Sequence, residues 1–185
     1  MAKKYVNPTK VVTGECRFSY ANLWEAKAMD ENSKPKYSVS LIIPKSDTKT
    51  IAKIKAAIEA AYEEGKSKLS NGKSVPSLSS IKTPLRDGDT DRLDDEAYAN
   101  SYFVNANSIT APGIVDADRQ QILTHSEIYS GIYGRASITF YAFNTKTSRG
   151  IACGLQNVQK LRDGEPLGGH SSAEEDFADD EDFLD

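Results

Sequence analysis

The sequence predicts a mainly β protein: a five-stranded Greek-key barrel of the OB type with long insertions, at least one α-helix and a disordered acidic C-terminal tail. Five segments between residues 10 and 161 have the composition and alternation of strands, and one clear helix lies among them. About 160 residues precede an abrupt change of composition, which is enough to bury a core without metals or disulfides. A β-sandwich is the competing architecture, because strand pairing cannot be read from one sequence.

The first two strands are predicted at residues 10–20 and 37–43. Alternation in the first, KVVTGECRFSY, places four side chains on one face: Val12, Cys16, Phe18 and Tyr20. The second, YSVSLII, is stopped by Pro44. Both segments are therefore predicted to be strands.

A helix is predicted after a cap at Ser46 or Asp47, ending near Glu64 because Gly65 follows. Its apolar positions recur at three- and four-residue spacing. Residues 65–80 and 84–96 are predicted as loops. Three later strands are predicted at 101–109, 132–143 and 150–161, and the last two form a hairpin with a polar turn at 144–149.

The chain is expected to divide into three regions. Residues 1–162 form the OB-fold body, 163–173 a flexible linker, and 174–185 a disordered tail that cannot bury enough apolar surface to offset the entropy of ordering it. The two cysteines, Cys16 and Cys153, are far apart and have no metal-ligand spacing, so we expect reduced, buried thiols. No signal peptide or apolar span is visible, so we expect a cytoplasmic protein.

The tail, EEDFADDEDFLD, reverses the sign of the charge. It holds eight of the 27 acidic residues and none of the 23 basic ones. Without it, 23 basic side chains face 19 acidic ones, so a chain of net charge −4 has a body of net charge +4. A basic body with an acidic, phenylalanine-bearing tail suggests that the body binds a polyanion and the tail imitates one.

The strand at 132–143 has the most distinctive surface. One side is continuously apolar, while the other carries rings and a guanidinium, namely Tyr133, Arg135, Tyr141 and Phe143. Unpaired bases stack on such rings, with about 1–3 kcal/mol for each base, and arginine contacts phosphates. The other interpretation is that these rings cover a second small core beneath the helix or a loop.

Basic and aromatic side chains elsewhere complete the candidate surface. Phosphates repel one another, so a groove that follows a nucleic-acid strand needs cations along its rim. Together with the strand above, the predicted DNA-contacting residues are Trp24, Lys34, Lys36, Tyr37, Arg86, Tyr102, Tyr133, Arg135, Tyr141, Phe143, Lys146 and Arg149.

Two fragments resemble enzyme motifs and are discounted. GKSKLSNGKS at 65–74 lacks the spacing of a phosphate-binding loop, since Ser67 stands where the first glycine is needed, and it follows a helix. The acidic run from Asp87 to Glu96 fails as a calcium loop, because Arg92 and Tyr98 occupy the positions of its glycine and its glutamate. A solvated acidic loop is the better interpretation, and no cofactor or metal is expected.

Several long, ordered segments resemble a family of phage-encoded single-stranded DNA-binding proteins. They are FSYANLW (18–24), YSVSLIIPK (37–45), PLRDGD (84–89), SYFVNANS (101–108), PGIVD (112–116), EIYSGIYGRASITFYAFN (127–144), GIACGLQNVQKLRDGEPLGG (150–169) and the acidic terminus. The resemblance implies an OB-fold core, binding of single-stranded DNA without strong sequence preference, and a role in phage replication and recombination.

In similar phage proteins the terminal tail contacts replication partners and competes with DNA for the protein's own groove. The resemblance carries this role to the matching residues Phe177, Asp179, Asp180, Glu181, Asp182 and Phe183. It also implies a polymerase, primase or helicase as partner and the host bacterial cytoplasm as location. The sequence leaves open whether the chain is a monomer or a homodimer.

The expected function is therefore a non-enzymatic protein that coats and protects single-stranded DNA. Two alternatives stay open at this point. One is a metal-dependent nuclease that uses the Asp87–Glu96 cluster. The other is an interaction protein whose acidic tail mimics DNA to inhibit a host factor.

Overall fold

The computed structural model describes residues 7–28, 30–70 and 72–167 of the 185-residue chain. Within these ranges, eight strands form one sheet: β1 Lys10–Val12, β2 Cys16–Lys27, β3 Lys36–Pro44, β4 Leu85–Asp87, β5 Ser101–Ser108, β6 Gly113–Val115, β7 Tyr133–Asn144 and β8 Arg149–Arg162. The helices are α1 Thr48–Glu64, α2 Lys66–Ser70 and α3 Gly88–Asp91, with short 3-10 turns at Leu78–Ser80, Glu96–Tyr98 and His125–Glu127.

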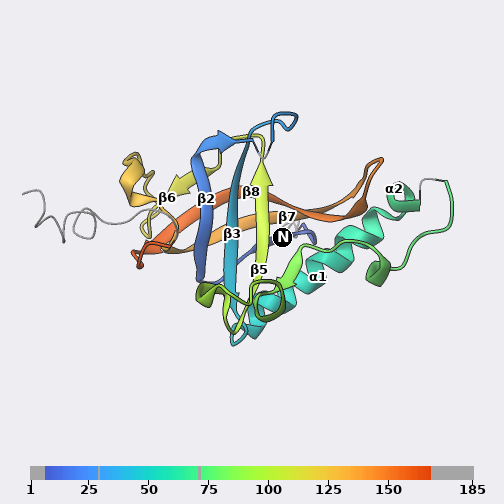
Figure 1. The fold of residues 1–185 in the computed structure, drawn as a ribbon, viewed down its shortest axis with the longest axis horizontal. Coiled ribbons are helices and arrows are strands. Elements are labelled where there is room, and N and C mark those ends of the chain that lie inside the picture. Colours follow the sequence, from blue (N-terminus) through green and yellow to red (C-terminus); the bar gives the residue numbers. More distant parts are fainter. Residues whose placement is uncertain (1–6, 29, 71, 168–185) are drawn as a thin grey trace, which may run out of the picture.

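Five of the strands close a barrel. The order β2-β3-β5-β8-β7 returns to β2, because β7 pairs with both β8 and the start of β2. Every pairing in this circuit is antiparallel except that of β5 with β8, which meet in parallel at Asn107 and Gly154. In Figure 1, β7 and β8 cross behind β2, β3 and β5. The predicted OB-type barrel is confirmed.

The core lies inside this barrel and under α1. The predicted apolar side of β7 is buried from Ile132 to Ala142, and it meets side chains such as Phe18 and Leu41 from the opposite strands. Helix α1 contributes Ile51, Ile54 and Ile58 at the predicted spacing. The alternation of β7 and the periodicity of α1 thus point both elements toward one interior.

The ends of α1 follow the predicted chemistry. The Asp47 carboxylate caps the helix by accepting a hydrogen bond of 3.1 Å from the Thr50 N–H. Gly65 closes the helix and donates its N–H to the carbonyl oxygens of Ala61 and Tyr62. The following residues, predicted as a loop, instead form the short helix α2.

The predicted strand at 10–20 is in fact two strands. The chain turns at residues 13–15, so β1 pairs with the middle of β7 while β2 begins opposite Gly134. The predicted face is therefore wrong at both ends, because Val12 is 44% exposed and Tyr20 is 62% exposed. Thr13 holds the turn by exchanging main-chain and hydroxyl hydrogen bonds with Ala136.

The start of the expected linker follows the barrel surface. The Leu167 N–H donates to the Ser130 carbonyl oxygen at 2.8 Å, and Arg17 donates to the Glu165 carbonyl oxygen at 2.7 Å. We call residues 163–167 the strap. The rest of the linker and the acidic tail lie outside the described residues. In the described ranges, no helix has the length and apolar character that crossing a bilayer requires.

Candidate nucleic-acid interface

The outer face of β3 and β5 carries serine and asparagine side chains. Register places Ser38 opposite Asn107 and Ser40 opposite Asn105, so two serine–asparagine pairs lie side by side. The intervening residues of both strands point into the core. An open groove of about 440 Å³ follows these pairs and extends onto β2. We call this surface the groove.

Tyr20 projects from β2 into the edge of the groove. The register between β2 and β3 shifts between Ser19 and Asn22, and Tyr20 lies in this irregularity with a positive φ of 47°. Such bulges change the direction of a side chain, here leaving the ring 62% exposed. Asn22 beside it donates to the Ser38 hydroxyl at 3.3 Å. Tyr20 therefore offers a free ring next to a row of amides and hydroxyls.

Lysines gather at one end of the groove. Lys27 and Lys36 are directly opposite each other on β2 and β3, and Lys34 lies in the loop that joins these strands. All three are exposed. Like charges in directly opposed positions destabilise a sheet. A polyanion at this end of the groove would relieve that repulsion.

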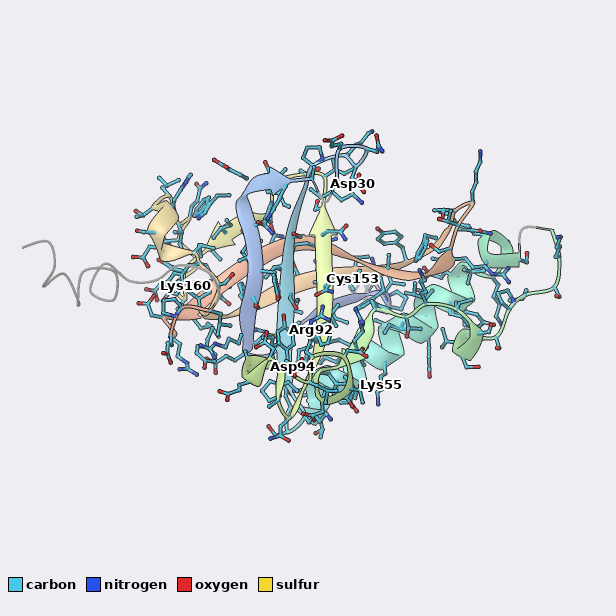
Figure 2. All side chains as sticks on the ribbon, in the orientation of Figure 1. Asp30, Lys55, Arg92, Asp94, Cys153 and Lys160 are labelled. Carbon is cyan, nitrogen blue, oxygen red and sulfur yellow. The ribbon has the colours of Figure 1, made fainter. Side chains whose placement is uncertain are left out.

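The segment from β4 to the start of β5 closes the other end. Tyr98 is fully buried there, its hydroxyl lies 2.9 Å from the Ser40 hydroxyl, and its ring meets Phe103 edge-on at 5.0 Å. Arg92 lies over the same Phe103 ring at 5.0 Å and also lines the groove. Figure 2 labels Arg92 at this position. The groove thus has lysines at one end and an arginine at the other.

The predicted contact residues are divided between surfaces. Lys36 lies opposite the groove residue Lys27, and Lys34 lies in the loop between β2 and β3, but neither lines the groove itself. Tyr37 is half-buried and points to the side of β3 opposite Ser38. Trp24 lies on β2, where its indole stacks on His125 at 4.3 Å and donates to the His125 carbonyl oxygen at 2.9 Å. Tyr102 points toward α1, with Lys45 and Lys55 over its ring.

The remaining predicted residues of the hairpin lie on the outer face of β7 and β8. Tyr133 is held between two guanidinium groups, Arg162 at 3.7 Å and Arg17 at 5.4 Å from its ring centre. Arg135 donates to the Thr13 carbonyl oxygen at 2.8 Å. Tyr141 is 46% exposed and Phe143 is half-buried near the β7–β8 turn. The structure brings none of these four residues to the groove.

The three remaining predicted cations lie at the closed end of the groove or at the β7–β8 turn. Arg86 pairs with Asp91 at 3.0 Å and covers the Phe103 ring at the closed end of the groove. Lys146 lies in the β7–β8 turn and is exposed, while Arg149 donates to the Leu69 carbonyl oxygen at 3.0 Å. The last two are taken up again below.

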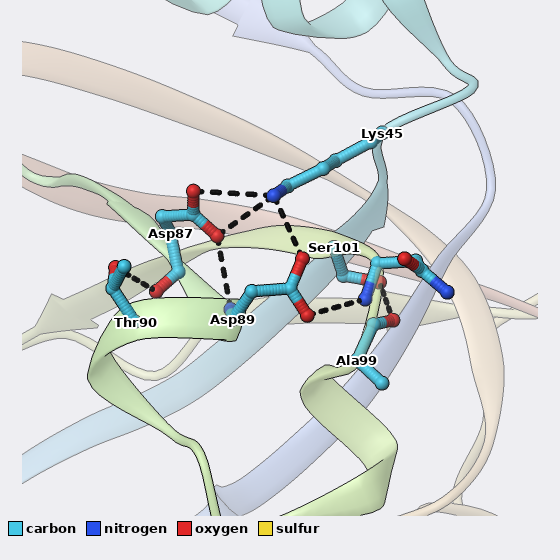
Figure 3. Close-up of polar contacts among 7 residues, drawn as sticks. Lys45, Asp87, Asp89, Thr90, Ala99 and Ser101 are labelled. Carbon is cyan, nitrogen blue, oxygen red and sulfur yellow. Dashed lines mark hydrogen bonds and ion pairs between the residues drawn. The ribbon is translucent and has the colours of Figure 1, made fainter.

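The acidic run beside the groove is built around a lysine. The Lys45 amine lies 2.9 Å from an Asp87 oxygen and 2.8 Å from an Asp89 oxygen, as Figure 3 shows. Hydrogen bonds to Asp89 and Asp87 raise the pKa of Lys45, and the hydrogen bond from Lys45 lowers the pKa of Asp89. Across the described ranges, no group of three His, Cys, Asp or Glu side chains could hold a metal ion. The nuclease alternative has no support from this geometry.

Sequence reasoning missed six groove residues: Tyr20, Asn22, Lys27, Arg92, Asn105 and Asn107. A signal for part of the set was present. SYFVNANS and YSVSLII alternate polar and apolar residues, with Asn and Ser on the outer face in place of the Lys and Glu of an ordinary solvated strand. These side chains become neighbours only through the β3–β5 register, which cannot be derived from the sequence.

The geometry defines an OB-fold protein whose groove has the shape and charge to hold an extended polyanion. The chain belongs to the family described as the single-stranded DNA-binding protein of Enterobacter phage Enc34, whose family model matches residues 9–184. The family resemblance expected from the sequence is confirmed.

Individual relatives agree with this membership. A putative protein p50 of Acyrthosiphon pisum secondary endosymbiont phage 1 is 29% identical over 90% of this chain and 91% of its own. The Enc34 protein, solved in complex with single-stranded DNA, is 26% identical with a TM-score of 0.72, covering 86% of this chain and 90% of its own. The single-stranded DNA-binding protein gp2.5 of bacteriophage T7, 13% identical with a TM-score of 0.60, covers 93% and 96% and shares the fold.

Proposed function

We propose that this chain binds single-stranded DNA in the groove, without strong sequence preference. The observation that carries the proposal is the outer face of β2, β3 and β5, where hydroxyls and amides lie between cationic ends. In OB folds, the face of the second and third barrel strands binds oligonucleotides, and β3 and β5 have that place here. The Enc34 relative, solved with single-stranded DNA, supports the same assignment.

Each kind of side chain has a separate part in this binding. The Tyr20 ring stacks on a base, which needs no particular sequence because every base has a flat face. Asn105 and Asn107 present both a donor and an acceptor, so they hydrogen-bond to any base edge. Lys27, Lys34 and Lys36 neutralise phosphates and release counterions.

The proposed biological role is to coat and protect single strands during phage DNA replication and recombination, in the cytoplasm of the host bacterium. The protein acts by binding and catalyses no reaction. Its acidic tail offers Phe177, Phe183 and the carboxylates between them to a polymerase, primase or helicase, and competes weakly with DNA for the groove. A homodimer is the assembly to test first, by light scattering.

The groove is tested by replacing Tyr20 with Asn, which removes the ring and tolerates the positive φ better than most residues. Loss of one stacked base should weaken binding of labelled oligo-dT by about tenfold, from about 1–3 kcal/mol per base. The matched control is Tyr141→Asn, an exposed tyrosine on β7. Equal affinity for Tyr20→Asn and wild type would remove the groove from the proposal.

The tail is tested by ending the chain at residue 173. The shortened protein should bind single-stranded DNA more tightly and with a steeper salt dependence, because eight carboxylates no longer compete with phosphates. Affinity is measured by fluorescence anisotropy at low and moderate salt. Unchanged affinity at low salt would show that the tail does not occupy the groove.

A further inference from the structure

A second cationic surface lies at one end of the long axis of the molecule. Helix α2 and the β7–β8 turn meet there, as Figure 1 shows, although 76 residues separate Lys68 from Asn144. The Asn144 side-chain amide donates to the Lys68 carbonyl oxygen at 3.0 Å, and Arg149 donates to the Leu69 carbonyl oxygen at 3.0 Å. These bonds fix the helix against the turn.

Two adjoining shallow depressions, of about 360 and 390 Å³, flank Lys146 at this junction. Lys68, Lys73 and Arg149 line them together with serine and threonine hydroxyls. We call these four cations the terminal basic site. Among the residues that the structure describes, no carboxylate and no aromatic ring lines either depression.

The cations of the terminal basic site have no acidic partners among the described residues, whereas the neighbouring Lys66 pairs with Glu63 at 2.8 Å. Cations gathered without counter-charges form a positive potential that attracts anions. The hydroxyls of Ser67, Thr147 and Ser148 beside them can donate to the oxygens of a phosphate. Two of the four cations, Lys68 and Lys73, come from the segment that does not fit a nucleotide-binding loop.

We propose that the terminal basic site binds phosphates of the same DNA strand beyond the groove, and so lengthens the stretch of DNA that one protein covers. This inference rests on the proposed function. The site recognises the backbone alone, because its lining has no ring on which a base could stack. Free nucleotides are poorer ligands for the same reason.

The test is a triple variant, Lys68→Ala with Lys73→Ala and Lys146→Ala, which leaves the structural Arg149 in place. The matched control is Lys10→Ala with Lys49→Ala and Lys53→Ala, three exposed lysines on β1 and α1 that change the net charge equally. Each protein is titrated with labelled oligo-dT of about 4 and about 16 nucleotides, the limits of site size per OB fold.

For the longer strand, the triple variant should bind about tenfold or more weakly at about 50 mM salt, and the slope of log K against log salt should fall by about 2, or about 0.7 for each lost contact. For the shorter strand it should match wild type within about twofold, since that strand fills the groove alone. The control variant should differ little from wild type with either strand.

Three results would overturn the inference: equal losses with both strand lengths, an equal loss in the control variant, or a difference that disappears once the acidic tail is deleted. The last would mean that the site holds the tail and not DNA. If the triple variant melts at a lower temperature, Lys146→Glu in the exposed turn gives the same comparison. Unchanged affinity in Tyr20→Asn would instead contradict DNA binding in the groove, independently of the result for the terminal basic site.

Discussion

The two outer faces of the barrel carry opposite kinds of side chain. The face of β7 and β8 has the rings and guanidinium groups expected of a DNA-binding surface, yet Tyr133 lies between Arg17 and Arg162 and Arg135 bonds to Thr13. The groove has small amides and hydroxyls beside Val39 and Ala106. Ser40 is buried, but Asn105 and Asn107 are at least partly exposed to an incoming strand. Composition alone would therefore identify the β7–β8 face as the DNA-binding surface, although its rings and arginines already contact other parts of the protein.

The difference shows that an arginine next to a tyrosine can stabilise the fold and does not by itself indicate a DNA-binding surface. A guanidinium over a ring contributes about 0.5–2 kcal/mol within a protein. On the β7–β8 face this pairing helps hold the strap. In the groove, Arg92 lies over Phe103, but neither the Tyr20 ring nor Lys27 takes part in a cation–π contact among the described residues. The binding capacity of Tyr20 and Lys27 is therefore left for another molecule. The predictions below separate stability, expected of the first face, from affinity, expected of the second.

The largest effect is expected where the strap lies against Gly131, just before β7. Gly131 has a φ of 123°, and a side chain there would overlap the Glu165 carbonyl oxygen. Gly131→Ala should lower the free energy of unfolding by about 2–4 kcal/mol through backbone strain and overlap. Affinity for single-stranded DNA, measured well below the melting temperature, should be unchanged.

Gly72→Ala is the matched control for this variant, because Gly72 also has a positive φ, 79°, but nothing lies within 4 Å of an added methyl group. It should show the strain alone, about 1 kcal/mol. Equal losses in chemical denaturation for the two variants would mean that the strap does not press on Gly131.

A smaller effect is expected for Tyr133→Ala. Removing the ring takes away its contacts with Arg17 and Arg162, which should lower stability by about 1–2 kcal/mol. Binding of oligo-dT should stay within about twofold of wild type. A large loss of affinity with an unchanged melting temperature would restore β7 as the binding face and break the comparison.

Some of this architecture was predictable because it is encoded locally. The burial of every second residue of β7 and the Asp47 and Gly65 ends of α1 depend on neighbours a few residues away. The short strands β4 and β6, of three residues each, leave no pattern long enough to recognise.

The groove was not predictable for a different reason. Ser40 and Asn105 become neighbours only through the β3–β5 register, and Tyr20 is exposed only because β2 is irregular there. Conversely, Tyr133 was recognised as pointing out of the barrel, but its arginine partners come from β2 and from the end of β8. Long-range pairing decides which outward residues are free.

The floor of the groove gives a further, more moderate prediction. Asn105→Ala together with Asn107→Ala should weaken binding of single-stranded DNA by about fivefold, equivalent to about 1 kcal/mol of lost hydrogen bonding. Stability should hardly change, because neither side chain is fully buried. The control is Gln156→Ala, which removes an exposed amide on β8. An equal loss of affinity in that variant would show that the groove amides contribute no more to DNA binding than an amide elsewhere on the surface.

The smallest effect concerns pH and the strap. The Lys160 amine lies 2.8 Å from a Glu127 oxygen and 2.6 Å from an Asp163 oxygen (Lys160 is labelled in Figure 2). Burial lowers the pKa of Lys160, but its hydrogen bonds to Asp163 and Glu127 outweigh burial and leave that pKa above its usual value. The hydrogen bonds from Lys160 and Tyr129 lower the pKa of Asp163.

These two shifts act at opposite ends of the pH range. The contribution of Asp163 is present above about pH 4 and is lost as pH falls through its lowered pKa, while that of Lys160 is present below about pH 10 and is lost as pH rises through its raised pKa. Lys160→Met should therefore lower stability at neutral pH by at most about 1 kcal/mol and flatten the pH dependence at both ends. Urea unfolding at about pH 3, 7 and 11 measures this, with Lys10→Met as control. If the free energy of unfolding of Lys160→Met changes with pH in parallel with that of wild type, the ion pairs contribute nothing. A change in oligo-dT affinity at neutral pH would show that the two faces of the barrel are not independent.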